Sequence, residues 1–183
     1  DYTNVSSVTF PANSSNTTLN VPTVDDNIIE PTETFEATIS TTATVNIITD
    51  EETGTIIDND AVTGTGVSFA NTDIVVAEGT DAFAIFNVIL IGNISENVTV
   101  DYSTNDGTAL NSSDYTTESG TITFTPTNNS FNIQVPITDD AIIEPTEAFT
   151  VVLSNVQSNL GLGFSDGNST NTANGTINDN DGG

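Results

Sequence analysis

A stretch of thirteen residues occurs twice in this chain, and its repetition limits what the chain can fold into. Residues 137–149 read ITDDAIIEPTEAF, and residues 23–35 read TVDDNIIEPTETF, 114 positions earlier. We refer to both copies as the repeated stretch. Self-similarity at a long, fixed spacing is typical of related structural units in tandem. The chain is therefore expected to contain two related units rather than one domain of 183 residues.

Each copy of the repeated stretch concentrates carboxylates. Four fall within nine residues in the second copy, at Asp139, Asp140, Glu144 and Glu147, and their counterparts are Asp25, Asp26, Glu30 and Glu33. Carboxylates at this density repel one another unless a counter-ion is present. The chain has no Lys, Arg or His and a net charge of −26, so the counter-ion must come from solution. Calcium, which prefers oxygen ligands, is the cation that this pattern indicates.

The acidic composition also excludes several functions. Without basic side chains the chain cannot hold nucleic acid phosphates or anionic lipid headgroups. The absence of Cys rules out disulfides, and no apolar run is long enough to span a membrane. Because His, Cys and Lys are all missing, the usual catalytic bases and nucleophiles are unavailable, and we expect no enzyme. Paired carboxylates could serve a glycosidase, but their repetition favours an ion site.

The pattern along the chain predicts an all-β protein. Short segments rich in Thr, Val, Ile and Phe are separated by Gly, Pro and Asn, and no amphipathic helix is apparent. Strands at this spacing favour a β-sandwich. The expected strands cover 5–10, 17–24, 34–40, 43–48, 54–57, 67–70, 74–78, 82–92, 97–103, 120–124, 131–138, 147–155 and 174–177.

The two units differ in completeness. Asp1-Tyr2 matches Asp114-Tyr115, so residues 1–60 correspond only to the second half of the later unit. We call residues 1–60 the half unit, residues 61–66 the linker and residues 67–183 the complete unit. Half a sandwich exposes strand edges and an apolar face. Either strands upstream in a longer chain complete it, or a neighbouring molecule supplies them.

The complete unit resembles a Calx-β domain, the module found in sodium–calcium exchangers and many large surface proteins. The resemblance is carried by Glu78 in VVAEGT, YSTNDGTA at 102–109, Asp114-Tyr115, GTITF at 120–124, the repeated stretch and the DND at 179–181. It implies a seven-stranded antiparallel, immunoglobulin-like sandwich in tandem repeat.

The resemblance also implies calcium ligands at one end of the sandwich. In the complete unit they would be Glu78, Asp106, Asp139, Asp140, Glu144, Asp179 and Asp181, with Glu147 a weaker candidate. In the half unit they would be Asp25, Asp26, Glu30, Asp58 and Asp60. Ala141 and Asn180 stand where calcium-binding members often have Asp, so fewer or weaker ions are expected.

These observations lead to a functional hypothesis. The chain is expected to be a calcium-binding structural repeat from an extracellular stalk, adhesin or filament, exposed on a cell surface or secreted. Its partners would be neighbouring Calx-β modules of the same or adjacent chains, and surface glycans or other cells. The alternatives are a regulatory calcium sensor, as in the exchangers, and a glycan-binding module that uses the loop at 158–171.

Overall fold

The computed structural model describes residues 1–41, 47, 50–60 and 64–181, and every regular element in this part of the chain is a β-strand. Consequently no described helix could cross a membrane. The complete unit has eight described strands, of which the first begins at the last residue of the linker: β3 (Gly66–Phe69), β4 (Asp73–Ala77), β5 (Phe83–Ile91), β6 (Val98–Asp106), β7 (Ser119–Phe124), β8 (Ser130–Pro136), β9 (Glu147–Gln157) and β10 (Thr170–Asn178).

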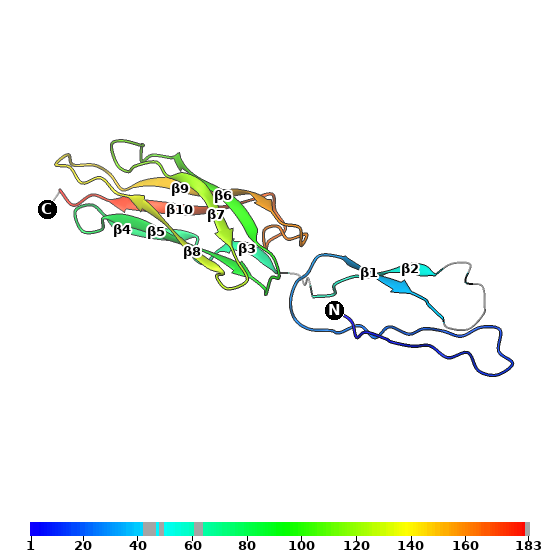
Figure 1. The fold of residues 1–183 in the computed structure, drawn as a ribbon. Coiled ribbons are helices and arrows are strands. Elements are labelled where there is room, and N and C mark those ends of the chain that lie inside the picture. Colours follow the sequence, from blue (N-terminus) through cyan, green and yellow to red (C-terminus); the bar gives the residue numbers. More distant parts are fainter. Residues whose placement is uncertain (42–46, 48–49, 61–63, 182–183) are drawn as a thin grey trace.

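These strands form a two-layer sandwich (Figure 1). One sheet has the order β4-β10-β9-β6-β7 and the other the order β3-β5-β8. Side chains along β5 alternate between buried and more exposed positions, as one face of each strand packs inward. Between the layers Phe86 of β5 meets Phe149 of β9 edge to face, with ring centroids 5.9 Å apart. The predicted sandwich is therefore confirmed.

The first strand of the sandwich is shared between the two sheets. β3 pairs antiparallel with β5, whereas β4 pairs in parallel with β10. The other pairs of the complete unit are antiparallel. Counted as one divided strand, β3 and β4 bring the number of strands to the seven that the resemblance implies. Because β4 runs beside β10, Glu78 directly after β4 comes close to Asp179 directly after β10.

The half unit contains two described strands, β1 (Glu33–Thr38) and β2 (Glu51–Ile56), which pair antiparallel. The prediction of strands over 5–10 and 17–24 is wrong, since neither segment forms a ladder. Their counterparts β7 and β8 pair with β6 and β5, which have no equivalent in residues 1–60. A strand needs a partner for its backbone groups, so these segments stay irregular. The expected strand over 43–48 falls almost wholly outside the described residues.

Local contacts are nevertheless repeated between the units. Tyr2 stacks on Phe35 with ring centroids 4.9 Å apart, and Tyr115 stacks on Phe149 at 4.5 Å. The N–H of Thr3 donates to Pro22, and that of Thr116 donates to Pro136, at 2.8 and 2.9 Å. The half unit thus keeps several local contacts of residues 114–181, although it lacks the strands equivalent to β7 and β8.

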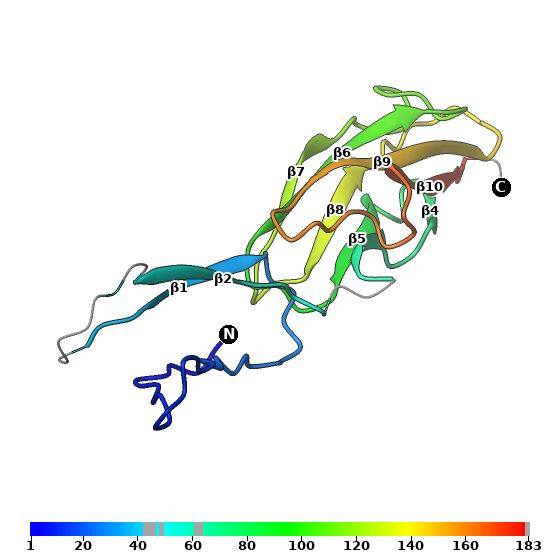
Figure 2. The same cartoon turned by 90° about the vertical axis from the view of Figure 1, so that its right-hand side faces the viewer.

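The two units lie end to end and are joined by a backbone contact (Figures 1 and 2). Ile29 forms a parallel bridge with Ile94 of the turn between β5 and β6. The N–H of Ile29 donates to Asn93 at 2.8 Å, and its carbonyl accepts from the N–H of Ser95 at 3.1 Å. We call this contact between residue 29 and residues 92–95 the joint.

Candidate metal centres

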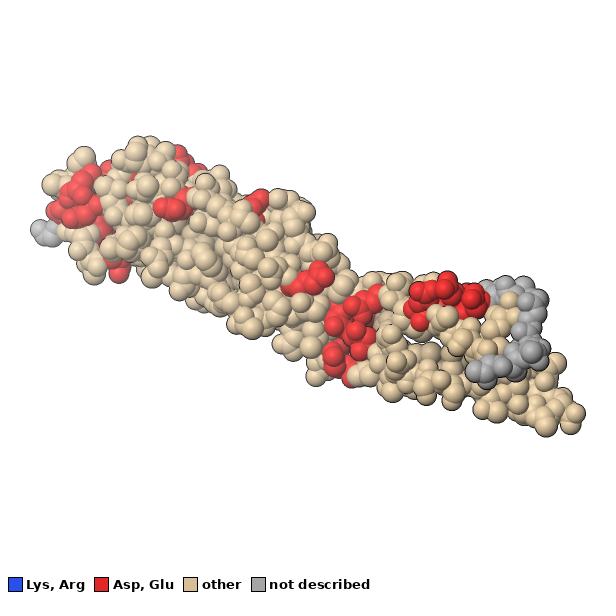
Figure 3. All heavy atoms as spheres, in the orientation of Figure 1, with Lys and Arg blue, Asp and Glu red and all other residues tan. Residues whose placement is uncertain are grey.

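Two groups of carboxylates come together at the end of the complete unit, away from the joint. Glu78, Asp179 and Asp181 form one group, and Asp114, Glu144 and Glu147 form the other. Within each group the three carboxylates offer oxygens that lie within 4.8 Å of one another. We call these six residues the end cluster. Figure 3 shows acidic side chains gathered at this end and again at the joint.

Backbone hydrogen bonds hold the end cluster in shape. The Asp179 carboxylate accepts the N–H of Glu144 at 3.2 Å through one oxygen and the N–H of Asp181 at 3.0 Å through the other. Glu78 is buried, and its N–H donates to the carbonyl of Asn178 at 3.1 Å. The ends of β4 and β10 and the repeated stretch therefore converge on one place.

The end cluster is electrostatically unfavourable without a cation. Burial, followed by the charges of Glu144 and Asp179, raises the pKa of Glu78 above its ordinary range. Burial and the carboxyl of Asp114 raise the pKa of Glu147 to about 7. Burial and neighbouring carboxylates likewise raise the pKa values of Glu144 and Asp181. Each of these shifts means that a negative charge costs free energy here, which a bound cation would offset.

Asp114 belongs to the end cluster, although on the sequence alone a turn cap was favoured over a ligand at this position. It is buried, and one carboxylate oxygen accepts the N–H of Leu110 at 2.6 Å, which is a turn-capping bond. The signal that could have found it was the match of Asp1-Tyr2 to Asp114-Tyr115, because an acid recurs there beside the same stacked tyrosine.

Other predicted ligands lie at or near this end without joining either group. Asp106 accepts the Tyr115 hydroxyl at 2.5 Å and the N–H of Asn111 at 3.0 Å, so these bonds engage its Oδ1. The exposed Asp140 accepts the N–H of Ile142 at 2.7 Å. Asp139 accepts the side-chain amide of Asn180 at 3.3 Å, and its charge raises the pKa of Asp181.

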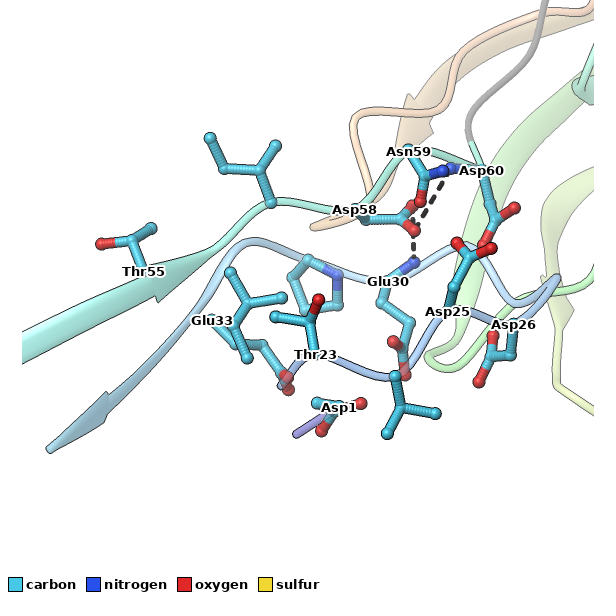
Figure 4. A pocket seen from close by; sticks show the side chains of 14 residues that line it. Asp1, Thr23, Asp25, Asp26, Glu30, Glu33, Thr55, Asp58, Asn59 and Asp60 are labelled. Carbon is cyan, nitrogen blue, oxygen red and sulfur yellow. Dashed lines mark hydrogen bonds between the residues drawn. The ribbon is translucent and has the colours of Figure 1, made fainter. Parts of the chain in front are cut away.

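The half unit brings all five of its predicted ligands to one pocket beside the joint (Figure 4). The pocket has a volume of about 180 Å³. We call its predicted ligands the joint cluster: Asp25, Asp26, Glu30, Asp58 and Asp60. Asp1 and Glu33, the counterparts of Asp114 and Glu147, also line it. Burial and the charges of Asp26 and Glu33 raise the pKa of Glu30.

The joint cluster repeats hydrogen bonds found at the acidic end of the complete unit. Asp58 accepts the N–H groups of Glu30 and Asp60, both at 3.2 Å, as Asp179 does for Glu144 and Asp181. Asp26 accepts the N–H of Ile28 at 2.8 Å, as Asp140 does for Ile142. The donor sets consist of carboxylate and amide oxygens, which suit calcium rather than a metal that prefers nitrogen or sulfur.

A family comparison agrees with this arrangement of acids on a sandwich. The model of the Calx-beta domain matches residues 1–61 and again residues 58–181. The chain belongs to the Calx-beta domain family. Both units are included in the match, so the half unit is a Calx-beta segment in its own right.

Individual Calx-beta proteins show the same similarity. Sodium/calcium exchanger 1 of Bos taurus is 45% identical over 69 residues, which is 38% of this chain and 7% of the exchanger. The Calx CBD1 domain in its apo form is 26% identical, with a TM-score of 0.56 over 63% of this chain and 96% of that one. The calcium binding domain CBD12 of CALX1.1 is also 26% identical, with a TM-score of 0.55 over 63% of this chain and 46% of that one.

Proposed function

We propose that this chain is a calcium-binding structural segment in which the ion stiffens a row of Calx-beta units. The end cluster and the joint cluster would each hold calcium through carboxylate oxygens, with Asp179 and Asp58 as the central ligands. Bound calcium would neutralise the acids and keep each repeated stretch in its folded shape.

The observation that carries the proposal is the position of the joint cluster. Glu30 and Asp58 flank the joint, because Ile29 makes the contact with the complete unit and Glu30 is bonded to Asp58. A pocket of about 290 Å³ beside them is lined by Glu30 and Asp58 on one side and by Asn159 and Leu160 on the other. An ion that fixes this stretch would therefore fix the angle between the units.

The test is a pair of matched variants in the full chain. Thermal melts are recorded with millimolar calcium and with a chelator, and the stiffness of the joint is measured by small-angle scattering. Calcium is expected to raise the melting midpoint, because the ion binds the folded state preferentially. Asp58→Asn should abolish the effect of calcium on the joint, while Asp179→Asn should leave that effect intact and weaken the end site. An unchanged midpoint on adding calcium would refute the proposal.

Location and partners form the second part of the proposal. We place the segment on a cell surface or in secreted material, in contact with other Calx-beta modules of its own or adjacent chains. Sites in extracellular modules typically bind calcium with Kd values of about 10⁻⁴–10⁻³ M, which suits exposed acids with Asn at position 180. Repulsion between such acidic chains also makes lateral association depend on cations. Detection of the protein on intact cells with an antibody would test the location.

A regulatory calcium sensor is the second candidate, and the similarity to sodium/calcium exchanger 1 favours it. The two functions differ in the affinity they require. Calcium titration by calorimetry should give micromolar or tighter binding for a sensor and near-millimolar binding for a structural segment.

Glycan recognition has less support from the geometry. The candidate loop has one aromatic side chain, Phe164, which is buried and bridges to Val67 instead of facing solvent. Sugar-stacking at this loop would need an exposed aromatic ring, so a glycan array is expected to give no binding.

A further inference from the structure

The repeated stretch contributes Ile29 to the joint, and its second copy presents the equivalent Ile143 at the other end of the molecule. Ile29 and Ile143 occupy the same position in the repeated stretch, yet Ile29 is 2% exposed and Ile143 is 74% exposed. The sequence around them is nearly the same, so their different exposure comes from what covers them. Ile29 is covered by the complete unit, whose Gly92 lies beneath it.

The local geometry that presents the two isoleucines is the same. Each isoleucine lies between two residues whose backbone N–H groups donate to Asp carboxylates. Asp26 and Asp58 accept from the residues on either side of Ile29. Asp140 and Asp179 accept from the residues on either side of Ile143. The stretch around residue 143 is therefore already in the shape that makes a joint.

The receiving surface is a compact turn. Gly92 has φ of 118°, which favours glycine, and a Cβ at this position would come within 2.9 Å of the Cδ1 atom of Ile29. The side chain of Ile29 thus fills space that only a glycine leaves open. Asn93 and Ser95 then bind both backbone groups of Ile29, and the hydroxyl of Ser95 adds a bond to its carbonyl at 3.0 Å.

Ile143 lacks these partners. In the part of the chain that the structure describes, no backbone hydrogen bond involves Ile143. Its donor, its acceptor and its apolar side chain are all available to a surface like the turn at 92–95.

We infer that Ile143 is a docking residue for the 92–95 turn of a further Calx-beta unit of this type. The partner is a second copy of the complete unit, placed after residue 181 as the complete unit is placed after residue 60. Its Gly92 would accept the side chain of Ile143, and its Asn93 and Ser95 would bind the backbone of residue 143. The inference rests on the proposed function only in taking units to be arranged in tandem.

The experiment extends the full chain by one unit. Residues 1–181 are followed directly by a further copy of residues 61–183, so that the linker sequence follows Asp181 as it follows Asp60. Hydrogen exchange of the Ser95 amide is measured by NMR in both copies. The Ser95 amide of the original copy donates to Ile29 and serves as the internal reference.

Both Ser95 amides are expected to be protected. Ile143→Ser should speed exchange in the added copy about tenfold or more and leave the original copy unchanged. Ile142→Ser is the matched control, because its counterpart Ile28 remains exposed at the joint, and it should change the rate by less than about twofold. An unprotected Ser95 in the added copy, or equal effects of the two variants, would overturn the inference.

Calcium is tested separately on the same protein. If the melting midpoint ignores calcium while Ser95 of the added copy stays protected, the proposed calcium function fails and the docking inference stands. If calcium raises the midpoint but Ser95 of the added copy is unprotected, the docking inference fails alone.

Discussion

Residues 1–60 and residues 114–181 share several local hydrogen bonds but bury very different amounts of apolar surface. Phe10 is 59% exposed, whereas its counterpart Phe124 is 1% exposed. Ile39 is 48% exposed, while Leu153 at the matching position is fully buried. Still, the Asp58 and Asp179 bonds and both Tyr–Phe stacks are present in the two units.

This difference separates two parts of the Calx-beta fold. The acidic end depends on contacts among the repeated stretch, the strand pair β1-β2 or β9-β10, and the acids that follow it. The buried core depends on β5, which lies in the second layer and pairs with β8, and on β6, which pairs with β7 and β9. A half unit can therefore present acids in the right places while leaving its apolar face uncovered.

The largest difference in stability is expected between substitutions of two equivalent phenylalanines, one buried and one exposed. Phe124→Ala should destabilise the complete unit by about 3–5 kcal/mol, because it leaves a cavity in a packed core. Phe10→Ala should change stability by less than about 0.5 kcal/mol, as expected for an exposed position. Chemical denaturation followed by circular dichroism measures both. Equal losses would show that strands from elsewhere complete the half unit in solution.

The joint gives the next largest effect. Ile29→Ala should cost about 2 kcal/mol, at the lower end of the range for buried isoleucine, since its side chain joins the core of the complete unit. Ile143→Ala in residues 1–183 should cost less than about 0.5 kcal/mol, because Ile143 is exposed. The two variants are compared by the same denaturation assay. A large loss from Ile143→Ala would contradict the exposed position of this side chain.

The end cluster should make stability depend on pH when calcium is removed. The pKa of Glu147 is about 7 in the folded chain and near 4.5 when unfolded. Protonation thus favours folding, so this contribution is fully present below pH 4.5 and is lost as the pH rises to about 7. Glu147→Gln should remove the loss, which is on the order of 1 kcal/mol once screening by solvent at this part-exposed site is taken into account. Melts in chelator between pH 5 and pH 8 would show it, with Glu33→Gln as the matched control.

Much of this arrangement could be predicted from the sequence, because spacing and repetition report on local structure. The strands of the complete unit follow from alternation, and the acids of the repeated stretch follow from its two copies. Strands over 5–10 and 17–24 could not be excluded, since alternation shows a suitable face but not whether a partner strand exists. Ile29 and Ile143 could not be told apart, because identical motifs have different neighbours. Asp114 was assigned to a turn cap rather than to the ligands, because sequence does not show that a carboxylate which caps a turn also lies beside Glu144 and Glu147.

The smallest expected effect concerns the asparagine in each closing acidic run. Asn180→Asp places a fourth carboxylate beside Asp139, Asp179 and Asp181, in a position where Asn180 now donates a hydrogen bond to Asp139. Without calcium the added repulsion should lower stability by a few tenths of a kcal/mol, since the site is exposed and screened, at about the level of other surface charge pairs. With calcium the sign should reverse, because an additional carboxylate raises affinity for the ion. Asn59→Asp, the matched change, should reverse in the same way at the joint cluster. Melts of both variants with calcium and with chelator decide the point, and a variant that is destabilised equally in both conditions would show that its acidic run lies outside the ion site.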